Sequence, residues 1–251
     1  RTMPLAGVRV LAFTQAWAGP SATAQLALLG ADVVQIENRT RPDVWRGAGR
    51  PVPDAVRGQQ RDGYGEQSPL NTNGMYNSAN FNKRAITLDM AAEEGRALFW
   101  RMAPLFDVVC DNFAPHVMPG WGITQESLEA ARPGIIFASM SAFGTEGPLS
   151  SYPGNGNTTE PMAGISAMNG YEGGSVANTG GLCPDPISGF FLAASILVAL
   201  HHREFTRRSR GRPEGQRITG AMLEAVACTA PGDAIAELSC NGGEPRGPQG
   251  N

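Results

Sequence analysis

The opening of the chain alternates two apolar runs with a helix signal, and this order constrains the fold more than any other feature of the sequence. Residues 8–13 read VRVLAF and residues 31–37 read ADVVQIE. Between them a loop reaches Pro20, and small and apolar residues then continue to Gly30, as in a helix with proline near its start and glycine after its end. Because both runs are continuously apolar, they suit parallel strands covered on both faces. The pattern predicts a βαβ unit.

The alternation of strand and helix signals continues along the rest of the chain. Further strands are expected at residues 84–89, 107–111, 134–141 and 216–220, helices at residues 92–106, 126–131, 160–169, 186–205 and from 222 onward, and loops at residues 144–157, 170–181 and 241–251. Residues 38–75 are polar, aperiodic and rich in glycine and proline, which predicts a long excursion near a functional site. The whole pattern predicts an α/β protein with a parallel sheet flanked by helices.

Charge and hydropathy argue against two classes of partner. The chain carries 20 Lys and Arg against 23 Asp and Glu, a net charge of −3, which gives no electrostatic attraction to nucleic acid. The longest apolar stretch, residues 187–200, is interrupted by Ser188, Gly189 and Ser195 and is shorter than a membrane-spanning helix requires. The N-terminal residues show no signal-peptide pattern. We therefore expect no membrane association and a cytoplasmic location.

The cysteines and histidines do not form a recognisable metal or disulfide pattern. The four cysteines are scattered without a CxxC pair, and there are only three histidines. His201 and His202 are adjacent on a predicted helix, so their side chains point about 100° apart and cannot share one metal ion. Neither a metal site nor a structural disulfide is expected.

Several nucleotide and hydrolase motifs are missing. The loop after the first strand reads FTQAWAGP instead of GxGxxG, so no NAD site is expected, and Glu37 is interpreted as a solvated residue at a strand end. Lys83 is the only lysine and lies in no P-loop motif. Residues 138–142 lack the glycines of a serine-hydrolase elbow. The arginine-rich residues 203–217 favour a solvated turn, with phosphate contact as the less favoured alternative.

One aspartate stands in an unusual setting. Asp185 follows the glycine-rich GGLCP and precedes Pro186 and an apolar helix. Proline suits the first helical position, which predicts Asp185 as the N-cap. A helix N-terminus favours the ionised carboxylate, which could serve as a nucleophile. From the residues alone, a simple capping role remains the alternative.

Five motifs in order resemble the class III coenzyme A transferase family of the CaiB/BaiF type, which includes the formyl-CoA transferases. The resemblance covers residues 4–224. Its motifs read PLAGVRVLAFTQAWAGPSATAQLALLGADVVQIE, NKRAITLDM, DNFAPHVM, GIIFASMSAFGTEGP and PDPISGFFLAASILVALHHRE. The resemblance implies a Rossmann-like large domain at residues 1–225, with residues 226–251 starting a linker toward a second, smaller domain that is largely absent from this chain.

The resemblance also implies a reaction and its nucleophile. Asp185 occupies the position of the family carboxylate that attacks an acyl-CoA thioester. A mixed anhydride, an aspartyl-CoA thioester and transfer to an acceptor carboxylic acid follow, with CoA as co-substrate and no metal or NAD. The resemblance further implies a catalytic role for Gln15 beside Asp185, and substrate positioning by Trp17 and Ala18.

The family's CoA contacts carry over less completely. Asn112 and Phe113 match an NF pair that contacts CoA. Three positions that are often basic in relatives are Asn38, Ala91 and Gly120 here, so the phosphates need other partners, and Arg39, Lys83 or Arg84 are substitutes. The expected CoA-binding set is Asn38, Arg39, Leu88, Ala91, Asn112 and Phe113.

Two other functions remain open. The family includes α-methylacyl-CoA racemases, which need a histidine where this chain has Asn155, and an amide cannot act as the base, so transferase is favoured over racemase. A non-catalytic CoA-binding subunit is the other alternative. Family members form interlocked dimers, which implies a homodimer or a heteromer with a related chain.

Overall fold

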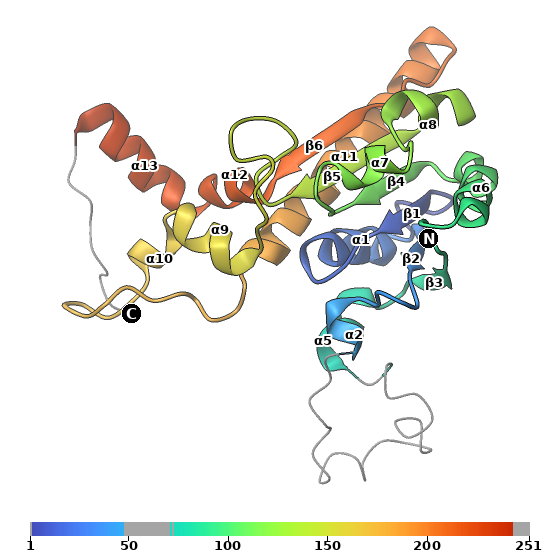
Figure 1. Cartoon of the computed structure of the whole chain (residues 1–251). Coiled ribbons are helices and arrows are strands. Elements are labelled where there is room, and N and C mark those ends of the chain that lie inside the picture. The colour runs from blue at the N-terminus through green and yellow to red at the C-terminus, as the bar shows by residue number, and fades with distance from the viewer. Residues whose placement is uncertain (1, 48–70, 72, 243–251) are drawn as a thin grey trace.

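Parallel strands form one sheet through the middle of the molecule (Figure 1). The structure is a computed structural model that describes residues 2–47, 71 and 73–242. Within this part of the chain the sheet has six strands in the order β3-β2-β1-β4-β5-β6. The strands are β1 (Arg9–Phe13), β2 (Asp32–Glu37), β3 (Arg84–Thr87), β4 (Val108–Asp111), β5 (Ile136–Ser141) and β6 (Arg217–Ala221). This is the strand order of Rossmann folds, and it confirms the predicted α/β class.

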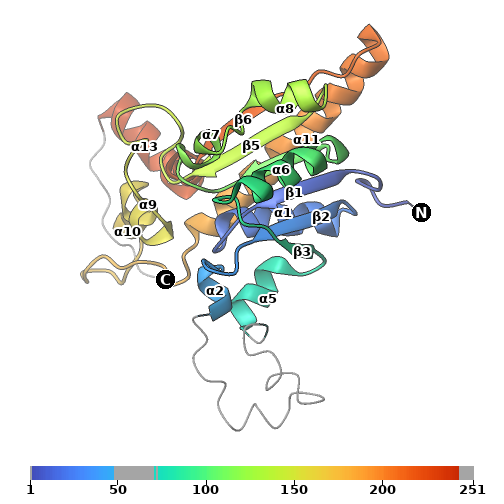
Figure 2. The same cartoon turned by 45° about the vertical axis from the view of Figure 1, so that its right-hand side comes forward.

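Helices cover both faces of the sheet (Figure 2). One layer holds α1 (Ala18–Leu28) and α11 (Pro184–Arg210), and the other holds α6 (Glu93–Met102), the 3₁₀ helix η3 (Ala103–Leu105), α7 (Val117–Gly120) and α8 (Gln125–Ala131). Successive residues of β1 alternate between the two layers: Val10 and Ala12 pack with α1 and α11, while Leu11 and Phe13 pack with α6 to α8. Burial on both faces explains why the inner strands β1, β2, β4 and β5 are mostly apolar.

Helices α1 and α11 approach each other closely near their N-termini. A Cβ at Gly189 would lie 2.7 Å from the carbonyl oxygen of Ala18 and 2.7 Å from Cβ of Ser21. Only a residue without a side chain fits there. This contact brings the first turn of α11, which carries Asp185, beside the first turn of α1.

Six further helices complete the described part of the chain. They are α2 (Val44–Gly47), α5 (Gly74–Asn80), α9 (Gly156–Met162), α10 (Ile165–Met168), α12 (Met222–Ala227) and α13 (Ala230–Asn241). Figure 1 shows α2 and α5 together on the β3 side of the sheet, and α9, α10 and α12 grouped beyond the ends of β5 and β6. These elements surround the carboxyl ends of the strands, where open α/β sheets bind ligands.

Several predicted helix boundaries are wrong. The helix expected at residues 160–169 is two helices, because Gly164 adopts a left-handed φ of 94° between α9 and α10. Helix α11 continues to Arg210 instead of ending near Phe205, and it stops where Gly211 turns left-handed with a φ of 73°. Its last turns are supported by ion pairs from Arg207 and Arg208 to Glu204.

The predicted excursion at residues 38–75 is only partly described. It contains α2 and the first residues of α5, so it is more ordered there than the sequence indicated. The rest of the excursion, residues 48–70 and 72, lies outside the described residues, as do residues 243–251 of the predicted terminal loop.

Among the described helices, α11 is the one that is long and apolar enough to cross a membrane by length and composition. The sequence did not indicate this helix as a membrane span, because its apolar residues do not form an uninterrupted run of the required length. Half of its apolar window is buried in this fold. The buried side, including Leu192, Ile196 and Ala199, packs in the core with α1 and the sheet.

Candidate active site

The loop between β1 and α1 is held by side chains from neighbouring strands. Thr14 donates its hydroxyl to Oε1 of Gln35 at 2.8 Å, and Nε2 of Gln35 donates back to the Thr14 carbonyl. The N–H of Gln15 donates to Oδ1 of Asn112 at 2.8 Å, and Nδ2 of Asn112 donates to the Gln15 carbonyl at 2.9 Å. Both side chains pair with backbone groups, so the position of this loop is fixed by β2 and by the residue after β4.

The next residue of the loop adopts a strained conformation. Ala16 has a φ of 60°, in the left-handed region that L-residues rarely occupy. Its N–H donates to Oδ2 of Asp43 at 2.8 Å, while Oδ1 of Asp43 accepts the N–H of Trp45 at 2.8 Å. After Ala16 the chain turns into α1, with Trp17 as the N-cap.

Asp185 lies at the start of α11, two positions further into the helix than predicted. The N-cap is Cys183, Pro184 takes the first helical position, and Asp185 takes the second. The expected N-cap role is therefore wrong. Pro184 and Pro186 can both stand in the first turn because the N–H groups of that turn have no partner within the helix. The side chain of Asp185 is 6% exposed and lies against α1 and α9.

Burial determines the charge state of Asp185. It raises the pKa of the carboxyl from 3.8 to about 6, against the opposing effect of backbone N–H groups of Ala18, Gly156 and Asp185 itself. The sequence predicted a preference for the ionised form, and the direction of the shift is opposite because desolvation exceeds the effect of the helix N-terminus. A pKa near 6 still leaves most of the groups ionised at pH 7.

One oxygen of this carboxylate has no partner. Oδ2 of Asp185 is buried and accepts no hydrogen bond within the described chain. It faces Gly156 at the start of α9, where a Cβ would lie 2.2 Å from Oδ2. Buried polar atoms without partners are rare in folded proteins because they cost free energy, and a catalytic role is one explanation for them. Trp45, Gln125 and Glu129 also have a buried polar atom without a partner among the described residues, but Asp185 is the one that lies in the first turn of α11, where the sequence indicated a functional carboxylate.

The residue before Gly156 has a structural task. Oδ1 of Asn155 accepts the N–H of Asn157 at 3.0 Å, and the backbone N–H of Asn155 donates to Oγ1 of Thr158 at 2.9 Å. These contacts form the N-terminal cap of α9. Capping accounts for Asn155 at the position where a racemase would need a base.

A pocket opens beside the loop, at the ends of β4 and β5. It measures about 210 Å³, and its lining residues are Asn112, Phe113, Ala114, Pro115, Ser141, Ala142, Phe143, Ser150, Tyr152, Pro153 and Gly154. The Phe113 ring packs edge-on against Trp121 at 6.1 Å between centroids. The predicted pair Asn112 and Phe113 thus connects the β1–α1 loop with a pocket whose lining carries no charged side chain.

The remaining predicted CoA residues lie together at the ends of β2 and β3. Oδ1 of Asp89 accepts Nδ2 of Asn38 at 3.3 Å and the N–H of Ala91 at 3.0 Å. Arg39 is exposed next to Asn38. Leu88 is buried in the hydrophobic core, so its backbone is the part that could meet a ligand. These residues form a group separate from the pocket at Asn112.

The two other proposed substitutes for phosphate ligands are occupied within the chain. The ammonium of Lys83 donates to the carbonyls of Pro20 and Ala79 and to Oδ1 of Asn80, each at 2.9 Å. Burial lowers the pKa of Lys83 to about 7. Arg84 pairs with Asp32, at the opposite end of the sheet from the carboxyl edge. Arg39 is therefore the substitute that stays exposed at the carboxyl edge.

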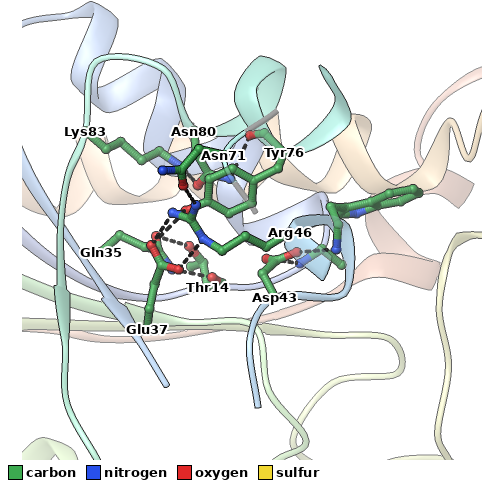
Figure 3. Close-up of polar contacts among 11 residues, drawn as sticks. Thr14, Gln35, Glu37, Asp43, Arg46, Asn71, Tyr76, Asn80 and Lys83 are labelled. Carbon is green, nitrogen blue, oxygen red and sulfur yellow. Dashed lines mark hydrogen bonds and ion pairs between the residues drawn. The ribbon is translucent and has the colours of Figure 1, made fainter. Parts of the chain in front are cut away.

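Glu37 is paired instead of solvated, which corrects the sequence interpretation (Figure 3). Its carboxylate accepts Nε of Arg46 at 2.6 Å and Nη2 of Arg46 at 2.7 Å, and it accepts the hydroxyl of Tyr76 at 2.8 Å. Burial, together with the bond to Glu37, raises the pKa of Tyr76. The sequence does not show this pairing because Arg46 and Tyr76 reach Glu37 only when α2 and α5 fold over the end of β2.

The chain matches a family of known proteins along almost its whole length. The sequence profile of CoA-transferase family III matches residues 5–251. The chain belongs to CoA-transferase family III. It is 35% identical over 222 residues to a formyl-CoA:oxalate CoA-transferase of Streptomyces coelicolor, covering 88% of this chain and 48% of that protein. It is 31% identical over 224 residues to a succinate–glutarate CoA-transferase of Agrobacterium fabrum, covering 89% and 52%.

A solved structure supports the same assignment. A CaiB/BaiF family protein from Brucella suis is similar with a TM-score of 0.82 and 28% identity, covering 100% of this chain and 61% of that one. The chain spans about half the length of the curated family III relatives it matches.

Several buried polar residues of this family III chain escaped the sequence analysis. Asp43 and Gln35 hold the β1–α1 loop, and Asp111 is buried beneath the pocket. Asp111 accepts the hydroxyl of Ser139 and the N–H of Phe113, and burial raises its pKa to about 6. Only the position of Asp111 at the end of β4 hinted at such a role, because partners distant in sequence meet only in the fold.

A second missed group lies behind Asp185. Glu160 is 1% exposed; its Oε1 accepts the N–H of Thr179 at 2.6 Å and its Oε2 accepts the Thr179 hydroxyl at 3.0 Å. This links α9 to the segment that leads into α11. In the described residues no group of three or more His, Cys, Asp or Glu side chains could hold a metal ion.

Proposed function

We propose that this chain carries the nucleophile of an acyl-CoA:carboxylate CoA-transferase, and that the nucleophile is Asp185. The observation that carries the proposal is the buried, unpartnered Oδ2 of Asp185 at the start of α11. An oxygen in this state is poorly solvated and has a lone pair free for bond formation. Membership of CoA-transferase family III supplies the class of reaction.

The proposed reaction exchanges one activated bond for another. Oδ2 attacks the thioester carbonyl of the donor, the C–S bond breaks, and CoA thiolate leaves behind a mixed anhydride. The thiolate then attacks Cγ of Asp185, which releases the donor carboxylate and forms an aspartyl-CoA thioester. An acceptor carboxylate attacks the same carbon and displaces the thiolate, which finally takes the acceptor acyl group and regenerates Asp185. No ATP is needed because each step conserves an activated acyl bond.

The surroundings of Asp185 suit these steps. The Ala18 and Gly156 N–H groups face the carboxylate and favour negative charge there. The glycine at residue 156 leaves room for a reacting carbonyl where a side chain would not fit. In this proposal Gln15 and Trp17, in the adjoining loop, orient the acyl group.

CoA itself would lie along the carboxyl edge of the sheet. We place its pantetheine arm beside Asn112 and Phe113, and its phosphates near Arg39, Asn38 and Ala91. The relatives that transfer CoA between formate and oxalate or between succinate and glutarate indicate small carboxylic acids as the substrate class. We also propose a dimer, because family resemblance implies it.

A racemase is the weaker candidate. The residue at the required base position, Asn155, is an amide that caps α9. Exchange of solvent deuterium into the α-carbon of an acyl-CoA, with no transfer of CoA, would support a racemase over the proposed transferase.

Intact-mass spectrometry under denaturing conditions tests the nucleophile. After brief incubation with a panel of acyl-CoAs, the unaltered protein should gain the mass of an acyl group or of CoA minus water, and a peptide map should place it on Asp185. Asp185→Asn should show no adduct and no CoA exchange.

The control is Cys183→Ser, which removes a thiol two residues away. This variant should keep the adduct. An adduct that persists in Asp185→Asn and disappears in Cys183→Ser would assign the chemistry to the thiol and overturn the proposal. An unmodified mass with every acyl-CoA, with no CoA exchange, would do the same and favour a non-catalytic CoA-binding subunit.

A further inference from the structure

The loop between β1 and α1 turns at one residue that is conformationally unfavourable. Ala16 has a left-handed φ of 60°, although it has a side chain. For an L-residue this region is disfavoured by roughly five- to thirty-fold relative to the right-handed region. Without a contact that stabilises the left-handed conformation of Ala16, the loop would adopt another conformation.

The hold on Ala16 comes from Asp43. Oδ2 of Asp43 accepts the Ala16 N–H at 2.8 Å across 27 positions of sequence, and the Asp43 side chain is 5% exposed. Figure 3 shows Asp43 among the side chains at the end of β2, beside Glu37 and below Arg46 and Tyr76. A hydrogen bond to a buried carboxylate is stronger than one between neutral groups, which suits it to hold a strained turn.

Capping of α2 does not account for this contact. Oδ1 of Asp43 accepts the Trp45 N–H at 2.8 Å, which is the ordinary task of an aspartate before a short helix. The second carboxylate oxygen, Oδ2, accepts the N–H of Ala16, which belongs to a different part of the chain. One side chain thus ties α2 to the β1–α1 loop.

The consequence reaches the proposed nucleophile. Two residues after Ala16, the backbone N–H of Ala18 faces the carboxylate of Asp185. The other residues of the loop are fixed separately, Thr14 by Gln35 and Gln15 by Asn112. Ala16 is therefore the point at which the direction of the following N–H groups is decided.

We propose that Asp43 is a positioning residue of the site: it holds Ala16 left-handed so that the first turn of α1 presents its N–H groups to the carboxylate of Asp185. The inference rests on the proposed function of Asp185. Asp43 does not contact the reacting atoms, so its removal should lower kcat more than it changes KM for the acyl-CoA.

The test is a rescue experiment on the intact enzyme. Asp43→Ala should lower kcat by roughly tenfold or more, since a misdirected donor at a reacting group costs that much or more. Glycine adopts the left-handed conformation without penalty. Asp43→Ala combined with Ala16→Gly should therefore recover about five-fold of the lost kcat, whereas Ala16→Gly alone should stay within about two-fold of the unaltered enzyme.

The matched control is Asp107→Ala. Asp107 is a buried aspartate that accepts a backbone N–H, from Arg9 at 2.8 Å, but at the opposite end of the sheet. The Asp107→Ala variant should be less stable than the unaltered enzyme but should have the same kcat. If either alanine variant fails to fold, Asp43→Asn and Asp107→Asn replace the pair, because an amide keeps one acceptor oxygen.

Two outcomes would overturn the inference. One is an Asp43→Ala enzyme with kcat within two-fold of the unaltered protein. The other is a loss that Ala16→Gly leaves untouched, which would mean that Asp43 acts through α2 or through stability alone.

Amide hydrogen exchange separates this inference from the proposed function. The Ala16 N–H should be protected in the unaltered protein and in the Asp107 variant, and should exchange at least ten-fold faster in Asp43→Ala. This readout needs no substrate. If the unaltered enzyme transfers no CoA, the proposed function fails and the catalytic role of Asp43 fails with it, whatever the exchange shows.

Discussion

Asp185 illustrates at the scale of one residue how the burial of a charged group costs stability at the proposed site. Its carboxylate is buried and one oxygen has no hydrogen-bond partner, a state that costs the folded protein free energy. The nearby N–H groups lower this cost without cancelling it, so burial leaves the pKa near 6. The residue is thus mostly charged at neutral pH and incompletely stabilised.

The free energy of unfolding should reveal this cost through Asp185→Asn. The folded-state pKa of Asp185 is raised above the unfolded value of 3.8 to about 6, so its contribution to stability is fully present below pH 3.8 and is lost as the pH rises through 6. At pH 8 the asparagine variant should be more stable than the unaltered protein by at most about 3 kcal/mol. At pH 4 the difference should shrink to about 0.5 kcal/mol.

Urea unfolding at both pH values measures this effect. Asp32→Asn, at a partly exposed aspartate at the other end of the sheet, serves as the control and should not reproduce it. An Asp185→Asn protein that is less stable at pH 8 would show that the carboxylate is stabilised by contacts absent from this structure.

At the scale of elements, the spacing between α1 and α11 places the site. Small residues line the contact between α1 and α11: α1 is rich in alanine, and Gly189 of α11 packs on Ala18 and Ser21. The first turns of both helices therefore meet, and the Ala18 N–H reaches Asp185. A wider separation would remove that N–H from the carboxylate.

Gly189→Ala tests this packing. The added Cβ would lie 2.7 Å from the Ala18 carbonyl oxygen, so the helices must separate, and we expect a loss of about 1–3 kcal/mol in the free energy of unfolding. Gly74→Ala is the control, because it adds a methyl group to open space at the start of α5 and should be neutral or slightly stabilising. Equal unfolding midpoints for Gly189→Ala and the unaltered protein would mean that α1 and α11 are not in close contact.

At the scale of the whole molecule, a buried charge cluster fixes α11 to the sheet end opposite the site. Oδ1 of Asp107 accepts Nη1 of Arg203 from α11 at 3.0 Å and Nη2 of Arg132, after α8, at 2.5 Å, while Oδ2 accepts the N–H of Arg9 in β1. The cluster joins both helical layers to the sheet. The two ends of α11 thus have different tasks, one holding the fold and the other presenting Asp185.

Arg203→Ala should separate these tasks. Removing one partner of a mostly buried carboxylate should cost about 1–3 kcal/mol of unfolding free energy, with kcat unchanged. Arg207→Ala, whose ion pair with Glu204 is exposed, should leave the unfolding midpoint where it was. Thermal unfolding and steady-state kinetics check both; a large fall in kcat for Arg203→Ala would show that the two ends of α11 are coupled.

Much of the fold was readable from the sequence because its signals are local. The four inner strands β2, β1, β4 and β5 are short, mostly apolar runs, and helix signals stand between them, so the α/β class followed without knowledge of any contact. The start of α11 was harder to predict because two prolines lie close together. Pro184, and not Pro186, is the first residue of the helix, so Asp185 lies in the first turn and is not the N-cap.

The sequence by itself determined the α/β alternation, the family resemblance and the choice of Asp185, since these depend on residue order and composition. Only the tertiary structure decided the charge state of that carboxylate, the pairing of Glu37 with Arg46, and the hold of Asp43 on Ala16. Burial and hydrogen bonding depend on groups that are distant in sequence and meet only when helices pack on the sheet. Periodicity and motifs carry no information about such meetings, because they describe each segment without its neighbours in space.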